Sequence, residues 1–179
     1  RHVLGRRVFR CKHVHGPVAL HRAIAESCNV YFYQLAEAVT MDRIAQMAFE
    51  FGLGHRSGIG INLETPGFIP TRAWYAQNYP GQWRIGHTLN TAIGQGNVRV
   101  TVLQLAMAYA ALANGGTLFV PQLVERVESP DGTVVQRFPP TVRRQVAVDP
   151  RQLDMIRRAL TDVVADRFGT AHGAQVSEV

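Results

Sequence analysis

Apolar residues recur at three- and four-residue steps across residues 18–39, which is the spacing expected along one face of a helix. The same spacing is compatible with two helices that are broken near Ser27. A further helix is predicted to begin after Thr40, which can cap it, and to end at Gly52. Residues 18–52 are therefore expected to be mainly helical.

The next segment, residues 52–96, has no such periodicity and is rich in Gly, Pro, Asn and Thr. This composition predicts long connections with short helical turns. One turn is expected to begin at Pro70-Thr71 and to carry Trp74. So long an irregular segment is unusual in a free-standing compact domain. We expect it either to be functional or to pack against a part of the protein outside this chain.

Two helix starts are well marked in the second half of the chain. Thr101 followed by Gln104 is the pattern of a capping box. Asp149-Pro150 combines a capping side chain with a proline suited to the first helical position, and this last helix is predicted to close at Gly169. The helix after Thr101 is predicted to bury one apolar stripe, made of Val102, Leu105, Ala106, Tyr109, Leu112 and Ala113.

Between these two helices the pattern changes to that of strands. Residues 117–124 and 127–138 read as strands around the turn Ser129-Pro130-Asp131-Gly132. Together the elements predict an α+β fold that is mostly helical, with one β-hairpin.

Composition limits the class of protein. A chain of 179 residues with 46% hydrophobic residues can form one domain with its own core, and it is neither disordered nor fibrous. No run approaches about 18 consecutive apolar residues, so no membrane-spanning helix is predicted. The basic N-terminal residues are not followed by an apolar stretch, so they are not a signal peptide. We expect this piece to be soluble, with any targeting segment outside it.

The net charge of +6 raises the question of nucleic-acid binding. The arginines are scattered from Arg1 to Arg167, and no aromatic ladder or known binding motif accompanies them, so we expect no nucleic-acid partner. Of the 19 basic residues only Lys12 is a lysine. A reaction that needs a lysine as its base must use Lys12 or a lysine from outside the chain.

The strongest candidate for chemistry is Ser27-Cys28-Asn29, near the expected helix break. A serine and an asparagine two positions apart can point the same way from a turn. The hydroxyl can pass a proton, and the amide of Asn29 can hold a peptide group. On residue type alone, the tripeptide favours a structural role as a helix cap over a chemical one.

Further segments in the same order make the pattern specific. Residues 27–34 are followed by residues 66–71, by Tyr79-Pro80-Gly81, by residues 89–96 and by residues 102–116. In this combination the chain resembles the central part of the transpeptidase domain of class B penicillin-binding proteins of the elongation type (penicillin-binding protein 2). The resemblance runs from about Phe9 to the C-terminus. It implies the α+β fold shared by penicillin-binding transpeptidases and serine β-lactamases, of which residues 1–179 would be a part.

The resemblance also implies an activity. Members of this family are serine acyl-transferases that cross-link peptidoglycan stem peptides through an acyl-serine intermediate, and β-lactams trap the same serine. Ser27 would then lie on the proton path and Asn29 would hold the amide carbonyl of the substrate. The implied partners are the stem peptide, β-lactam antibiotics and the cell-wall elongation machinery. The implied location of the whole protein is the bacterial inner membrane, with its catalytic domain in the periplasm.

The chain departs from the family pattern in the other two motifs. No Ser-x-x-Lys is present around Ser27, Ser57, Ser129 or Ser177, and no Lys-Thr-Gly occurs. We expect the first motif before Arg1 and the third after Val179, so that the isolated chain is inactive. Its helix faces would then be partly uncovered, which predicts self-association or a partner chain.

A metal site is a second candidate. Cys11, His13, His15 and Cys28 offer thiolate and imidazole ligands at four positions, which suit tetrahedral zinc, and Cys11, His15 and Cys28 are the predicted ligands. The resemblance supports His15, because it precedes a glycine, and Cys28 of the middle motif, whereas the acidic ligands of relatives are not evident. The alternative is a buried structural cysteine with solvated histidines. The expected chemistry itself requires no cofactor, so any zinc would be structural.

One alternative function shares the fold. A non-catalytic β-lactam sensor or scaffold would carry the same central motif, and the sequence on either side of this chain would distinguish it from a transpeptidase.

Overall fold

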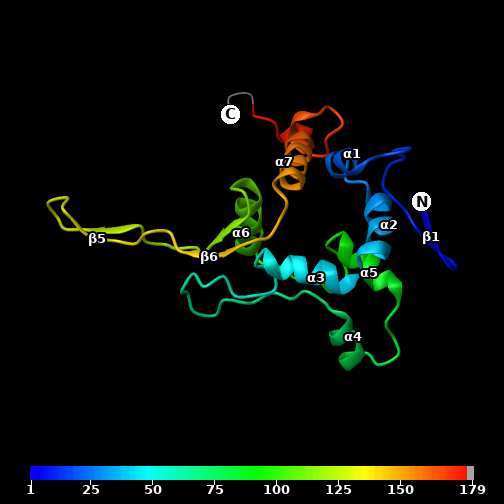
Figure 1. The fold of residues 1–179 in the computed structure, drawn as a ribbon, viewed down its shortest axis with the longest axis horizontal. Helices are drawn as coiled ribbons and strands as arrows, with labels where there is room; N and C mark the ends of the chain where they lie inside the picture. Colours follow the sequence, from blue (N-terminus) through cyan, green and yellow to red (C-terminus); the bar gives the residue numbers. More distant parts are fainter. Residues whose placement is uncertain (177–179) are drawn as a thin grey trace. The chain divides into compact units, whose positions relative to one another are not determined.

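The protein is described here from a computed structural model, which places residues 1–176 (Figure 1). Within these residues the helices are α1 (Leu20–Ala25), α2 (Asn29–Val39), α3 (Met41–Glu50), α4 (Arg72–Asn78), α5 (Ile85–Ala92), α6 (Val102–Ala113), α7 (Pro150–Ala165) and a 3-10 turn, η1 (His172–Ala174). The strands are β1 (His2–Leu4), β2 (Arg7–Phe9), β3 (Thr117–Phe119), β4 (Arg126–Glu128), β5 (Val134–Arg137) and β6 (Val142–Gln145). The predicted α+β class is confirmed.

The chain divides into two compact units. The first contains Arg1–Met47, Pro70–Val98 and the chain from Val148 onward, and the second contains Ala48–Ile69 and Arg99–Ala147. No helix in residues 1–176 combines the length and apolar character needed to cross a membrane.

In the first unit, the structure has the second of the two predicted alternatives, two helices broken near Ser27. Ser27 has a φ of 52°, in the left-handed region that non-glycine residues seldom adopt, and it separates α1 from α2. The backbone N–H of Cys28 donates to the Ala23 carbonyl at 2.8 Å, so the turn stays hydrogen-bonded through the break. Tyr33 and Ala36 of α2 pack with Leu89 of α5 to form the core of this unit.

The hairpin β1–β2, helix α5 and the turn η1 of the first unit were not predicted. The hairpin β1–β2 turns at Gly5, and its strands of three residues are too short to show an alternating pattern. Helix α5 lies in the segment predicted to be irregular. It is capped by Arg84, whose backbone N–H donates to Nδ1 of His87 at 3.1 Å, and arginine is not a usual capping residue. Helix α4 follows the prediction, since the Thr71 hydroxyl accepts from the Trp74 N–H.

Helix α7 begins as predicted, with the Asp149 carboxylate accepting from the Arg151 N–H at 2.7 Å. It ends at Ala165 rather than at Gly169. Gly169 instead allows the chain to fold back over the end of the helix, because a Cβ there would lie 2.4 Å from the Asp162 carbonyl oxygen. Helix α7 packs against α1.

In the second unit, the predicted capping box of α6 is confirmed, but the prediction of which residues of α6 are buried is wrong. Thr101 accepts from the Gln104 N–H at 3.1 Å, and Gln104 accepts from the Thr101 N–H at 3.0 Å. The buried residues of α6 are Gln104, Met107, Ala108 and Ala111. Val102 is 84% exposed, because nearly every position of the helix is apolar and the periodicity could not identify its inner face.

The strands of the second unit are partly as predicted. β4 and β5 form the expected hairpin around Ser129–Gly132, with the Ser129 N–H donating to the Thr133 carbonyl. Residues 120–124 are not strand, and β3 pairs with β6, which the sequence did not reveal. Such long-range pairing is not encoded in local periodicity.

Candidate functional site

The site forms at the turn between α1 and α2. The Ser27 hydroxyl is exposed and lies 3.0 Å from the Thr170 hydroxyl, which is 143 positions away in the sequence. The Thr170 N–H donates to the Ala25 carbonyl at 3.1 Å, so backbone and side chain together hold the segment after α7 against this turn. The part played by Thr170 could not be predicted from the sequence, because nothing local links it to Ser27.

Ser27 and Asn29 share one cavity. Both line a hollow of about 230 Å³ whose remaining walls are apolar: Ile24, Phe32, Ala92 and Ile93. Asn29 is the first residue of α2, so its side chain leaves the helix at the end where backbone N–H groups are free. A hydroxyl and an amide on one small cavity can hydrogen-bond to a peptide group together. The capping alternative for Ser27 is not observed, since the N-cap of α2 is Cys28 and no side-chain hydrogen bond caps it.

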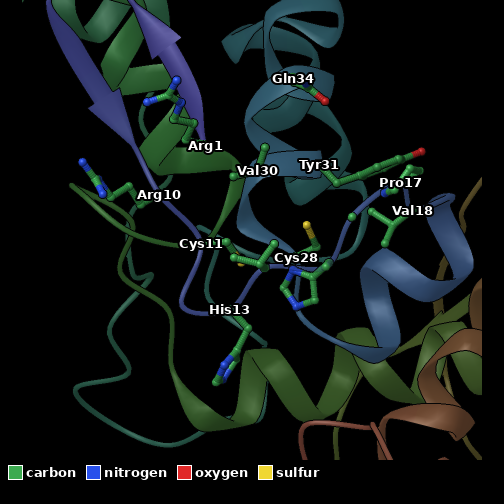
Figure 2. Close-up of a pocket in the computed structure, with 13 residues that line it drawn as sticks. Arg1, Arg10, Cys11, His13, Pro17, Val18, Cys28, Val30, Tyr31 and Gln34 are labelled. Atoms are coloured by element: carbon green, nitrogen blue, oxygen red, sulfur yellow. The ribbon is translucent and has the colours of Figure 1, made fainter.

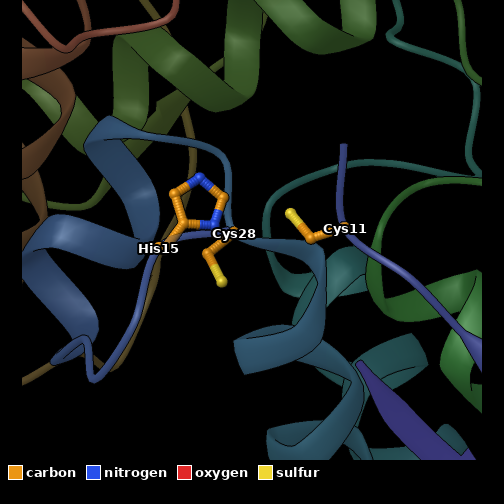
Figure 3. Close-up of side chains that lie close together, drawn as sticks. All are labelled: Cys11, His15 and Cys28. Atoms are coloured by element: carbon orange, nitrogen blue, oxygen red, sulfur yellow. The ribbon is translucent and has the colours of Figure 1, made fainter. Parts of the chain in front are cut away.

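The three predicted metal ligands also lie together, next to this turn (Figure 3). The ligand atoms of Cys11, His15 and Cys28 are all within 4.8 Å of one another. In tetrahedral zinc sites the ligand atoms are roughly 3.3–3.8 Å apart, given metal–ligand bonds of 2.0–2.3 Å. Movements of about an ångström would therefore bring these three ligand atoms to the distances of a tetrahedral zinc site. Sulfur and imidazole donors also suit zinc chemically. The cluster could hold a metal.

Cys11 lies between the N-terminal hairpin and α1 in the sequence, and its sulfur contacts the backbone N–H groups of Asn29 and Val30 at the start of α2. Burial raises the pKa of its thiol, but backbone N–H groups of His13, Asn29, Val30 and Lys12 lower it, and the net pKa is below the ordinary value. The Cys11 sulfur also lies 3.8 Å from the Ser27 carbonyl oxygen. Cys28 is buried, with 4% of its surface exposed.

His15 has an acidic neighbour. Its Nε2 lies 3.7 Å from the Glu26 carboxylate, and both side chains are largely buried. Glu26 is also paired with Arg22 one helical turn earlier. A carboxylate beside a metal-binding imidazole orients the ring and makes it a better ligand.

Two cavities adjoin the cluster. One of about 660 Å³ is lined by Cys11, His13, Cys28 and Tyr31, among others (Figure 2). The other, of about 540 Å³, is lined by Cys11 and His15 together with Ser27 and Thr170. The metal cluster and the Ser27 turn therefore belong to one continuous region of the first unit.

The fold and this region define the class of protein. Residues 6–179 match the family model described as penicillin binding protein transpeptidase domain. The chain therefore belongs to the penicillin-binding protein transpeptidase family.

Individual relatives show which type of penicillin-binding protein the chain resembles. The chain is 34% identical over 159 residues to peptidoglycan D,D-transpeptidase MrdA of Acinetobacter baumannii, covering 89% of this chain and 23% of that protein. It is 35% identical over 160 residues to the MrdA of Salmonella typhimurium, covering 88% and 25%. The chain is part of the transpeptidase domain of a class B penicillin-binding protein of the PBP2/MrdA type, and it spans about a quarter of the length of these relatives.

Solved structures of PBP2 proteins are similar to this chain in fold. PBP2 of Helicobacter pylori superposes with a TM-score of 0.82 at 27% identity, covering 99% of this chain and 32% of that one. PBP2 of Pseudomonas aeruginosa, in complex with WCK 5153, gives a TM-score of 0.74 at 32% identity, covering 87% and 33%.

Proposed function

We propose that the protein containing this chain is a peptidoglycan D,D-transpeptidase, in which Ser27 and Asn29 form the middle part of the active site. The observation that carries the proposal is the cavity that these two side chains share at the α1–α2 turn. The relationship to MrdA proteins supports the reaction class.

The reaction would proceed by acyl transfer. A nucleophilic serine attacks the D-alanyl-D-alanine peptide bond, the terminal D-alanine leaves, and an amine of a neighbouring strand then takes the acyl group. Ser27 would relay the proton to the leaving nitrogen, since a hydroxyl can accept one proton while donating another. Asn29 would donate to the carbonyl of the substrate amide. A β-lactam would acylate the same serine.

The nucleophile is proposed to lie elsewhere in the longer protein. None of the four serines of this chain is followed by a lysine three positions on within it, and Lys12 is not followed by Thr-Gly. The two lysine-containing motifs would come from the same longer protein, which we propose to be anchored in the inner membrane with this domain in the periplasm. A PBP2 of Helicobacter pylori has been solved in complex with MreC, which supports a role for this protein in an elongation assembly.

A fluorescent penicillin tests this function. The whole protein is expected to become covalently labelled, whereas residues 1–179 alone are expected to remain unlabelled at the same drug concentration. Mass spectrometry of the labelled protein should place the adduct on a serine outside residues 1–179. Labelling of the isolated chain on a serine, or no labelling of the folded whole protein, would contradict the proposal.

We also propose that the cluster of Cys11, His15 and Cys28 holds a structural zinc ion. The donor set supports zinc, and Glu26 beside His15 supplies the outer carboxylate that such sites commonly contain. A bound ion would fasten the segment before α1 to the turn that carries Ser27.

Metal analysis of the purified chain is expected to find one zinc ion per molecule, which a strong chelator removes. His15→Ala is expected to weaken zinc binding by at least about tenfold, because loss of even an outer-shell partner of a metal ligand typically costs about 10–100-fold in affinity, and His15 is a direct ligand in the proposed site. His13→Ala is the matched control, since His13 lies two positions away, is exposed and is not a member of the cluster. Equal zinc content in both variants would rule out the site.

A further inference from the structure

Two thiols face the same small space beside the Ser27 turn. The sulfur atoms of Cys11 and Cys28 lie within 4.8 Å of each other, and both cysteines are free thiols (Figure 3). A disulfide needs a sulfur–sulfur distance of about 2.05 Å. Residues 10–19, which carry Cys11, have no regular secondary structure, so side-chain rotation and a small backbone shift can close the remaining gap.

The two thiols differ in access. Cys11 is partly exposed and lines both cavities beside the cluster, one of about 660 Å³ and one of about 540 Å³. Cys28 is 4% exposed at the N-cap of α2. A soluble oxidant can therefore reach Cys11 first, and Cys28 is placed to attack whatever forms on the Cys11 sulfur.

We propose that Cys11 and Cys28 are a redox pair that closes to an intramolecular disulfide, and that this cross-link and metal binding exclude each other. The disulfide stands on the sulfur geometry and does not depend on the transpeptidase function, whereas the exclusion of metal rests on the zinc site proposed above. The oxidant is a small-molecule or protein disulfide. Two of the three metal ligands become one disulfide, which leaves His15 alone and so removes the site.

The exchange balances in two steps. The Cys11 thiolate attacks one sulfur of the oxidant disulfide, forming a mixed disulfide and releasing one thiolate. The Cys28 sulfur then attacks the Cys11 sulfur, forming the Cys11–Cys28 bond and releasing the second thiolate. Two electrons and two protons pass from the cysteines to the oxidant, which leaves as two thiols.

The cross-link would tie a loop to the middle motif. Cys28 separates Ser27 from Asn29 in the sequence, and the Cys11 sulfur already lies 3.8 Å from the Ser27 carbonyl oxygen. Either a metal ion or a disulfide at this place joins the segment before α1 to the turn. The oxidised and the metal-bound forms are thus two ways of fastening the same contact.

The test uses the reduced, metal-free chain incubated with oxidised glutathione. The intact mass is expected to fall by two hydrogen atoms, and both cysteines are expected to lose their reactivity toward an alkylating reagent, with full recovery after reduction. A peptide map should contain the Cys11–Cys28 cross-link. A glutathione adduct that persists on Cys11 of this chain, or a disulfide between two chains, would overturn the proposal.

Single variants separate the roles of the two thiols. Cys28→Ser is expected to accumulate a stable glutathione adduct on Cys11, because no second thiol resolves it. Cys11→Ser is expected to keep a free Cys28 over the same time, and circular dichroism checks that each variant is folded. His15→Ala removes a metal ligand but neither sulfur, so it should still form the disulfide. Loss of the disulfide in a folded His15→Ala chain would contradict the proposed thiol pair.

Zinc binding by the oxidised and reduced chains tests the proposed mutual exclusion. The disulfide form is expected to bind no zinc above the level of the doubly substituted Cys11→Ser, Cys28→Ser chain, and reduction should restore binding if the reduced cluster holds zinc. Zinc bound equally well by the oxidised and reduced chains would overturn the mutual exclusion. If neither form binds zinc while the disulfide forms, the zinc proposal and the mutual exclusion both fail, and only the disulfide pair stands.

Discussion

Ser27→Ala in the whole protein is expected to lower the rate constant for acylation by benzylpenicillin by about 10²–10⁴-fold, the usual contribution of a positioned proton-transfer group. The variant loses the one hydroxyl that lines the cavity shared with Asn29. Stopped-flow or quenched measurements of acyl-enzyme formation give this rate directly, separately from the hydrolysis of the adduct.

The backbone at Ser27 needs its own control, because its φ of 52° is unfavourable for any residue with a Cβ. Ser27→Gly removes the hydroxyl and relieves this strain, whereas Ser27→Ala removes the hydroxyl and keeps it. If the hydroxyl carries the proton, both variants should be slow to the same extent. Acylation that is slow in Ser27→Ala and normal in Ser27→Gly would show that backbone conformation is what matters.

A matched substitution elsewhere checks for general effects. Ser129→Ala also removes a serine hydroxyl, from the exposed turn between β4 and β5, and it is expected to leave acylation unchanged. Thermal unfolding of all three variants should accompany the rates, because Ser27 also contacts Thr170.

Local signals in the sequence identified the helices whose ends have specific side chains. Thr71, Thr101 and Asp149 each cap the helix that follows, and each does so through a side-chain oxygen at two or three residues' distance. The hairpin turn at Ser129 was likewise predictable, since its hydrogen bonds lie within five residues. Such contacts depend on neighbours in the sequence and are therefore visible in it.

The elements that sequence analysis missed depend on distant parts of the chain. β6 forms because it pairs with β3 across an intervening hairpin, and Thr170 reaches Ser27 only because α7 packs on α1. Neither contact produces a local pattern of apolar and polar residues from which it could be predicted. The same limit applies to the inner face of α6, where the one polar residue, Gln104, points inward and the apolar Val102 points out.

The candidate site was predictable in part for a different reason. The grouping of Cys11, His15 and Cys28 followed from ligand chemistry together with the family resemblance, which supported His15 and Cys28, and the structure brings these three ligand atoms together. The pairing of Ser27 with Asn29 followed from a turn between two helices. The cavity that the two side chains share could not be predicted, because its wall includes Ala92 and Ile93 from the end of α5.

Gln104→Leu is expected to destabilise the second unit by roughly 1–3 kcal/mol, because it removes two hydrogen bonds that a buried amide donates to backbone carbonyls, each typically worth about 0.5–1.5 kcal/mol. The Gln104 side chain is 1% exposed and donates to the carbonyls of His55, at 2.6 Å, and Pro66, at 2.9 Å. It thereby fastens α6 to a long connection that has little regular structure. Urea unfolding should show a lower midpoint with an unchanged dependence on urea concentration.

Gln122→Leu is the matched control, since that side chain also donates to a carbonyl but is exposed to water. The free energy of unfolding of Gln122→Leu is expected to stay within about 0.5 kcal/mol of that of the unsubstituted chain.

Gln104→Glu separates hydrogen bonding from packing, because it keeps the shape of the side chain but points a carboxylate at two carbonyls. The folded state then favours the protonated acid, so the pKa of this carboxyl is raised above its unfolded value. The stability of the Glu variant should therefore fall as the pH rises through that pKa, whereas the Leu variant should show no added pH dependence. Equal stability of Gln104→Leu and Gln122→Leu would mean that the buried hydrogen bonds of Gln104 do not hold α6 in place.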